Sequence, residues 1–309
     1  MDTKAYKKEF SRLGLRMALC SLVIMGIQYG SQFLVLAVNR EWVDNPDIML
    51  ASSMVPLYLL GYPVTFWIIK AGSEKRDIEK HRMKPWQFIL AFMMSYGILI
   101  LGNMIGLGVT LGIGLLKGEE VVNPLLAVLD DVNLWISSVY IVLLAPAFEE
   151  YLFRKLICDR VVKYGQGTAV FVSGFMFGLF HGNFNQFFYA FFIGCFFAYI
   201  YVKTGKIRYT IGLHMIVNFI GSVAGGLLLQ NVEMESVTGM IVYALYALCV
   251  YGIAITGIVL FLVNRPKMKL DAGEMVIERG SWFRTVLCNA GMIIYIVLFT
   301  LQMLVFSLL

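Results

Sequence analysis

Charged residues are scarce in this chain. Asp, Glu, Lys and Arg make up only 15% of its 309 residues, whereas hydrophobic residues make up 59% and the mean hydropathy is +0.77. A soluble domain contains roughly a quarter charged and about 45–50% apolar residues. Because one water-soluble core could not bury so many apolar side chains, we expect a polytopic membrane protein.

Several patterns that would indicate other classes of protein are also absent. The five cysteines are scattered without a C-x-x-C pair, which argues against a disulfide framework. The chain has no H-E-x-x-H sequence and is therefore not a zincin. No alternating strand pattern is present, which argues against a β-barrel. No basic fold signature indicates nucleic-acid binding, so we expect no nucleic-acid partner.

Nine apolar stretches are candidates for membrane-spanning helices, each of which needs about 20 residues. They predict an all-α membrane bundle. Without a repeat or a long linker, residues 1–309 are expected to form a single membrane domain. The fifth stretch is short for a full crossing and is expected to be tilted or buried. The nine stretches cover residues 17–38, 48–69, 86–114, 132–153, 167–182, 184–202, 209–230, 239–263 and 286–309.

Basic residues occupy alternate loops, which orients the chain. They lie in the N-terminal tail and after the second, fourth, sixth and eighth stretches, where they also account for the net charge of +5. By the positive-inside rule the N-terminus is cytoplasmic and the C-terminus external. The abundance of Ile, Met, Tyr, Phe and Lys favours a bacterial plasma membrane as the location. The acidic residues of the other loops are Glu41, Asp44, Asp47, Glu119, Glu120, Asp130, Asp131, Glu233 and Glu235.

Two adjacent glutamates, Glu149 and Glu150, end the fourth stretch. Ionisable groups at membrane depth are costly and tend to mark pathways or chemistry. Adjacent helical residues point about 100° apart, and Arg154 follows Glu150 at the spacing of an ion pair on one helix face. Glu150 is therefore expected to pair with Arg154, which leaves Glu149 available as a general base after a possible kink at Pro146. Alternatively, both glutamates lie at headgroup level and pair with Arg154 and Lys155.

Two of the three histidines lie in later apolar stretches. His181 follows Phe177 by four residues, and a histidine at the end of a span is also compatible with an interfacial or hydrogen-bonded role. His214 lies inside the seventh stretch with Asn218 one turn later on the same face. Such a pair can converge on a water or a developing oxyanion, or it can join two helices by hydrogen bonds.

Glycines recur at every fourth position before His181. Gly174, Gly178 and Gly182 are expected to share one helix face, to allow close packing and to hold His181 beside the fourth helix. Gly102 and Gly106 repeat the pattern in the third stretch. Polar residues with chemical promise are confined to about residues 132–230, so the first three and last two helices are expected to serve as scaffold.

The ordered set E-E-x-x-x-R, F-x-x-x-H and H-x-x-x-N resembles a known family. It is similar to the CAAX prenyl protease and bacteriocin-processing family of intramembrane proteases, also called the abortive-infection family. The resemblance covers roughly residues 132–230, which would form the catalytic core helices. The matching residues are Glu149, Glu150, Arg154, Phe177, His181, His214 and Asn218.

The resemblance implies an endopeptidase that acts within or at the membrane on a peptide or protein substrate, including lipid-modified ones. It implies that Glu149 activates water, that His181 helps to hold this water, and that His214 and Asn218 stabilise the oxyanion. Glu150 and Arg154 would orient the helix end. Two histidines and a glutamate could also form a zinc site with an open position. A glutamate mechanism without a cofactor is favoured over zinc.

One geometric condition follows. His181 lies about 20 Å along a helix that starts on the side where Glu149 ends its own helix. The site therefore requires a tilted or re-entrant helix, or a fourth helix that continues past Arg154. The competing functions are a proton-coupled transporter, which usually shows repeated halves, and a non-catalytic membrane scaffold of the same fold.

Overall fold

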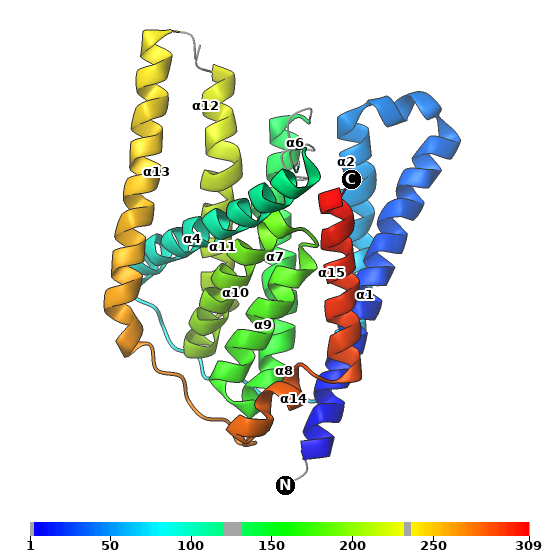
Figure 1. Ribbon diagram of the computed structural model, residues 1–309, viewed down its shortest axis with the longest axis vertical. Coiled ribbons are helices and arrows are strands. Elements are labelled where there is room, and N and C mark those ends of the chain that lie inside the picture. The colour runs from blue at the N-terminus through cyan, green and yellow to red at the C-terminus, as the bar shows by residue number, and fades with distance from the viewer. Residues whose placement is uncertain (1–2, 120, 122–131, 232–235, 309) are drawn as a thin grey trace.

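The structure is a computed structural model that describes residues 3–119, 121, 132–231 and 236–308. Throughout these residues the regular structure is helical and no strand occurs, which confirms the predicted all-α bundle (Figure 1). Some acidic loop residues of the predicted topology lie outside the described residues: Glu120, Asp130, Asp131, Glu233 and Glu235.

Eight helical rods in the described part of the chain are long and apolar enough to cross a membrane. The chain is therefore a multi-pass membrane protein. The rods are α1 (Thr3–Val38); α2, η2 and α3 (Pro46–Pro56, Leu57–Gly61, Tyr62–Lys70); α4 (Pro85–Lys117); α6, η3, α7, η4, α8 and η5 (Leu134–Ser138, Val139–Leu144, Ala145–Glu150, Tyr151–Cys158, Asp159–Val161, Val162–Tyr164); α10 (Phe184–Thr204); α11, η6 and α12 (Ile207–Asn218, Phe219–Ala224, Gly225–Asn231); α13 and η7 (Val237–Asn264, Arg265–Lys267); and α15 (Ala290–Leu308).

The ninth predicted span is α9 (Gln166–Phe180), a 15-residue helix shorter than a full crossing. It compensates by burial, because nine of its residues are enclosed by neighbouring helices. Short helical turns complete the fold at the bundle ends: η1 (Arg40–Asp44), η8 (Arg279–Ser281) and α14 (Trp282–Val286).

Small residues let the rods approach closely. A Cβ on Gly102 of α4 would overlap the backbone of Tyr189 in α10, and one on Gly257 of α13 would overlap the carbonyl of Met93 in α4. Gly14 of α1 makes a similar backbone approach to Gly291 of α15. Without a hydrophobic driving force between helices in lipid, such close contacts are a main source of association.

The predicted glycine face of α9 is only partly correct. Gly174 and Gly178 do share a face, but it packs on Cys195 and Phe191 of α10 rather than on the fourth rod. Gly182 lies beyond the end of the helix with φ +65°, in the left-handed region, where its Cα faces Gln302 of α15. The helix ends because this residue can adopt a backbone conformation that other residues avoid.

The fourth rod runs from Leu134 to Tyr164, past the predicted end at residue 153. The prediction was wrong there because the charges after residue 153 do not mark a loop. Arg154 and Asp159 are fully buried, with Lys155 bonded to Asp159 at 2.7 Å and Tyr201 donating to the same carboxylate at 2.7 Å. Pairing within the protein lets these residues continue the helix.

This continuation meets the geometric condition for the site. Glu149 lies fifteen residues before the end of the fourth rod at Tyr164, and His181 lies fifteen residues after the start of α9 at Gln166. Because the two helices form a hairpin, both residues come to similar depth in the bundle. Of the two arrangements expected from the sequence, the structure has the longer fourth helix.

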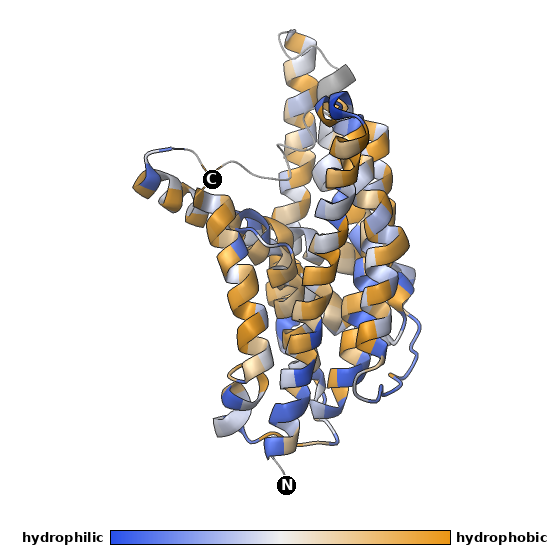
Figure 2. Ribbon diagram, turned by 90° about the vertical axis from the view of Figure 1, so that its right-hand side faces the viewer, coloured by the Kyte–Doolittle hydropathy of each residue, from blue (hydrophilic) through white to orange (hydrophobic). Residues whose placement is uncertain are grey.

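The basic segments assigned to one side of the membrane lie together at one end of the bundle. Hydrophilic residues gather toward the end that holds the N-terminus (Figure 2). Three ion pairs join the N-terminal tail and the four basic loops: Glu9–Lys163 at 2.7 Å, Arg76–Glu274 at 3.3 Å and Lys203–Asp271 at 2.8 Å.

Candidate active site

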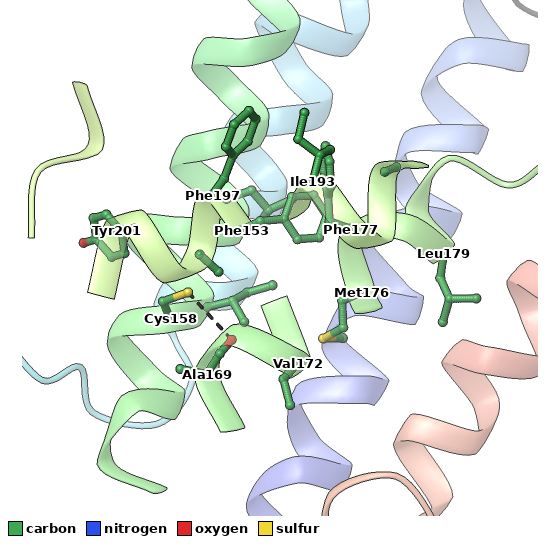
Figure 3. Packing of buried hydrophobic residues seen from close by; sticks show 14 of the residues in the cluster. Phe153, Cys158, Ala169, Val172, Met176, Phe177, Leu179, Ile193, Phe197 and Tyr201 are labelled. Atoms are coloured by element: carbon green, nitrogen blue, oxygen red, sulfur yellow. Dashed lines mark hydrogen bonds between the residues drawn. The ribbon is translucent and has the colours of Figure 1, made fainter. Parts of the chain in front are cut away.

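The candidate site is built on a tightly packed aromatic core. Phe153 of η4 packs edge-on against Phe177 of α9, with ring centroids 5.1 Å apart. Phe197 of α10 lies in the same buried cluster (Figure 3). Rigid aromatic packing of this kind fixes the helices that carry the polar residues.

Glu150 and Arg154 form a fully buried ion pair at the centre of this core. Arg154 Nε donates to Glu150 Oε2 at 3.0 Å and Nη2 donates to Oε1 at 3.2 Å, with neither side chain exposed. Nη1 donates to the hydroxyl of Ser173 at 2.7 Å, and this hydroxyl donates to the Phe153 carbonyl at 2.9 Å. The guanidinium also lies 4.9 Å from the Phe177 ring centre. The pair expected from the i, i+4 spacing is therefore present, and both of its side chains are fully buried.

His214 of α11 connects both glutamates. Its Nδ1 lies 3.1 Å from Glu150 Oε1, and its Nε2 lies 3.9 Å from Glu149 Oε2. An ionised carboxylate can only accept hydrogen bonds, so Nδ1 carries the hydrogen of the shorter contact. This fixes the ring and turns Nε2 toward Glu149. Phe177 and Phe197 hold the two sides of the ring, with centroid distances of 5.8 Å and 5.6 Å.

Glu149 differs from its neighbour because its carboxylate is not committed. Its side chain is 15% exposed, compared with 0% for Glu150. Among the described residues no side chain or backbone group donates a hydrogen bond to it, and His214 at 3.9 Å is beyond direct hydrogen-bond distance. A polar contact of this length can be bridged by a water molecule.

The second rod supplies one wall of the site, a contribution that the sequence did not predict. Tyr58 and Tyr62 are buried and pack their rings on Phe148 at 5.0 Å and 5.2 Å. Phe148 directly precedes Glu149 in the chain. This rod is thus more than scaffold. The spacing of Tyr58, Tyr62 and Phe66 at every fourth residue was the available signal, because it marks one aromatic helix face.

His181 lies at the end of α9, next to Phe177. Its Nδ1 is 2.9 Å from the Phe177 carbonyl oxygen, so Nδ1 donates and Nε2 is left unprotonated in the neutral ring. The ring packs edge-on against Phe177 at 4.8 Å. Within the described residues His181 forms no hydrogen bond or ion pair with Glu149 or Glu150. The His181 and His214 rings both pack against Phe177, which lies between these contacts in place of a direct bond.

Asn218 satisfies a backbone group on the fourth rod. Its side-chain Nδ2 donates to the carbonyl of Ile141 at 2.9 Å. This carbonyl lies in the π-helical turn η3, where the Ala145 amide bonds to Tyr140 five residues back. In the same register Ile141 would accept from residue 146, which is a proline and has no N–H. The asparagine amide therefore replaces the missing backbone donor, a role that the His214–Asn218 spacing did not indicate.

A zinc site of two histidines and a glutamate was the alternative to a glutamate mechanism. Among the described residues no group of three or more His, Cys, Asp or Glu side chains is placed to hold a metal ion. Glu150 is bound by Arg154, and Nδ1 of His181 bonds to backbone. A mechanism without a metal stays a prediction.

Comparisons with known proteins agree with this arrangement. Residues 131–220 match the family model of the type II CAAX prenyl endopeptidase Rce1-like proteins. The chain is also 24% identical over 216 residues to the membrane-embedded CAAX protease MroQ of Staphylococcus aureus (strain USA300), covering 64% of this chain and 85% of that protein. No solved structure matches the chain. These similarities favour a protease over a transporter or a scaffold, and with the eight apolar spans they support the resemblance to the CAAX prenyl protease and bacteriocin-processing family of membrane-embedded proteases.

Proposed function

We propose that this protease hydrolyses peptide bonds of membrane-associated or lipid-modified substrates by means of a water activated by Glu149. The observation that carries the proposal is the contrast between the glutamates. Glu150 is held by Arg154 and His214, whereas the Glu149 carboxylate is partly exposed and lies 3.9 Å from His214 Nε2. A base must be free to accept a proton and close to the group that it activates.

In this mechanism Glu149 accepts a proton from water as the water oxygen attacks the carbonyl carbon of the scissile peptide. The electron pair of the carbonyl bond moves to its oxygen. When that tetrahedral intermediate collapses, the carbon–nitrogen bond breaks and the proton held by Glu149 passes to the leaving amine. The carboxylate is regenerated without a covalent intermediate.

The remaining site residues act on this water and on the oxyanion. His214 is oriented by Glu150 so that a protonated Nε2 can donate to the developing oxyanion. His181, whose Nδ1 is bound to the Phe177 carbonyl, would accept a hydrogen bond from the water through its free Nε2. Asn218 retains one amide hydrogen after donating to Ile141, and this hydrogen is the one that an oxyanion role would use.

The substrate class follows from the position of the site within a bundle. Glu149 lies within a membrane-spanning rod, and the Tyr58 and Tyr62 rings pack on the preceding residue, Phe148. Aromatic rings with polar tips suit an extended peptide that enters from the interface. We therefore expect peptide or protein substrates held at the bilayer, by a lipid group or by an apolar segment.

Substitution of Glu149 tests the proposal. In cells that express the proteins at equal levels, membrane-associated peptides are compared by mass spectrometry for wild type, Glu149→Gln and Glu278→Gln. General-base catalysis typically contributes about 10²–10⁴-fold, so peptides with new C-termini should be lost in Glu149→Gln. The Glu278→Gln control makes the same chemical change in the exposed loop before η8 and should match wild type. Full cleavage by Glu149→Gln would reject Glu149 as the base.

A further inference from the structure

A large apolar cavity lies on the side of α10 away from His214. Phe197 contacts His214, whereas Cys195 and Phe196 line the cavity. Its volume is about 590 Å³, within the range of roughly 300–1,000 Å³ typical of small-molecule sites. Arg265 is the single charged residue among those of the described chain that line it. The apolar lining comes from α4, α9, α10, α13 and the loop after α13, and includes Ile98, Leu101, Val170, Phe192, Phe261 and Leu270.

The cavity continues into a basic recess of about 390 Å³. Phe196, Tyr199 and Met268 line both spaces, which makes them contiguous. No acidic residue of the described chain lines the recess. Its basic residues are His81, Arg82, Lys203 and Lys267.

Most of the positive charge around this recess is uncompensated. Lys203 pairs with Asp271 at 2.8 Å and His81 lies 3.5 Å from Glu79. The other three basic groups, Arg82, Lys267 and the neighbouring Arg265, form no ion pair with any described residue. The recess therefore offers unpaired cationic groups to an anion.

The recess and the cavity follow each other along α4. Trp86, near the start of α4, is 58% exposed and lines the recess, together with Leu90. Tryptophan is enriched at the membrane–water interface. Ile98 and Ile105, further along the helix, line the cavity. The basic groups thus lie at headgroup depth and the apolar space lies deeper in the membrane.

We propose that the recess and cavity form a binding site for an anionic phospholipid, with the phosphate-bearing headgroup at Arg82, Arg265 and Lys267 and one acyl chain in the apolar cavity. Basic pockets between membrane helices on the basic-loop side suit such headgroups. A zwitterionic lipid carries its own positive charge and would meet the same three cations less favourably. An apolar segment of protein would leave the cationic recess without a partner.

Photoreactive lipids test this site in the full-length protein. Purified protein in nanodiscs is irradiated with phosphatidylglycerol or phosphatidylcholine that carries a diazirine on one acyl chain, and labelled peptides are mapped by mass spectrometry. Phosphatidylglycerol should label the α4 and α10 residues of the cavity in preference to phosphatidylcholine. The double variant Arg265→Gln, Lys267→Gln should reduce this labelling roughly fivefold for each charge removed.

Two matched controls make the test decisive. The double variant Lys80→Gln, Lys269→Gln removes two exposed charges from the same end of the bundle but outside the recess, and should keep the labelling. Leu101→Trp, which fills the cavity, should abolish labelling, whereas Leu107→Trp, at a similarly exposed position of the same helix that does not line the cavity, should not. Equal labelling by the two lipids, or equal losses in site and control variants, would overturn the proposal. The readout does not depend on peptidase activity.

Discussion

At the scale of single residues, the candidate site separates two chemically identical side chains. Glu149 and Glu150 are neighbours in the chain, yet the helix turns them toward different surroundings. Glu150 accepts hydrogen bonds from Arg154 and His214, while the Glu149 carboxylate is partly exposed and lies 3.9 Å from His214 Nε2. One carboxylate is thereby assigned to structure and the other is left for chemistry.

The buried pair leads to a stability prediction. Arg154→Met leaves the Glu150 charge buried beside His214 alone, and breaking a buried pair typically costs about 3–5 kcal/mol. The melting temperature in detergent should fall accordingly. Adding Glu150→Met should recover part of this loss in melting temperature, because both buried charges are then gone. The double variant should lack peptidase activity, because Glu150 no longer holds His214.

An exposed pair provides the control for that experiment. Lys75 and Asp77 lie 3.3 Å apart with both side chains more than half exposed. Exposed pairs contribute about 0–1 kcal/mol, so Lys75→Met should leave the melting temperature nearly unchanged. Similar losses in Lys75→Met and Arg154→Met would contradict the energetic role assigned to burial.

The sequence predicted part of this site for physical reasons. The Glu150–Arg154 contact could be predicted because both residues lie on one helix at fixed spacing. The bond from His214 to Glu150 could not, because it joins two helices whose packing depends on many side chains. The same limit applies to Tyr58 and Tyr62.

At the scale of elements, Asn218 and Pro146 act on the same carbonyl. The Asn218 amide donates to Ile141, in place of the N–H that Pro146 lacks. This links α11 to the fourth rod directly before the glutamates. The spacing of His214 and Asn218 identified them as a pair, but the partner of the amide depended on a π-helical turn that has no sequence signal.

A double-mutant cycle tests this link. Asn218→Ala should lower the free energy of unfolding by about 1 kcal/mol, the usual size of one hydrogen bond. In a Pro146→Ala background the restored backbone N–H can serve the carbonyl, so the same substitution should cost much less. The cycle is measured from unfolding midpoints in detergent. Equal costs of Asn218→Ala in both backgrounds would contradict the proposal that Asn218 compensates for the N–H missing at Pro146.

The elements also show where a sequence argument from charge fails. In the described part of the chain a helix lies at each of the nine predicted stretches, although the first begins at Thr3 and not at residue 17. The fourth was ended at residue 153 because basic residues follow it. Arg154, Asp159 and Lys163 are buried in the structure, each with a bonded partner. Charge marks a membrane boundary only when it faces water or headgroups.

At the scale of the whole molecule, the basic segments share one end of the bundle. The positive-inside rule assigns this end to the cytoplasm, and the ion pairs between its loops hold it together. Two faces of α10 then have different roles. One face packs against the candidate active site, and the other lines the proposed lipid site.

Substituted-cysteine labelling tests the orientation. In a background with the five native cysteines replaced, Lys75→Cys and Glu41→Cys introduce thiols at two exposed positions in successive loops. A membrane-impermeant maleimide added to intact cells should label Cys at position 41 only. Inverted vesicles should show the reverse. Labelling of position 75 in intact cells would place the N-terminus outside.

The π-helical turns beside the glutamates also affect which single-residue insertions and deletions the chain can accept. A π-helical turn holds one more residue than an α-helical turn over the same span, and η3 and η4 lie on either side of Ala145–Glu150. Deleting one residue from Val139–Leu144 would convert that turn to an α-helical turn and leave the segments on either side close to their present orientation. In a regular α-helix the same deletion would rotate one side by about 100° relative to the other. Single-residue insertions and deletions are therefore tolerated better in these turns than elsewhere in the rod.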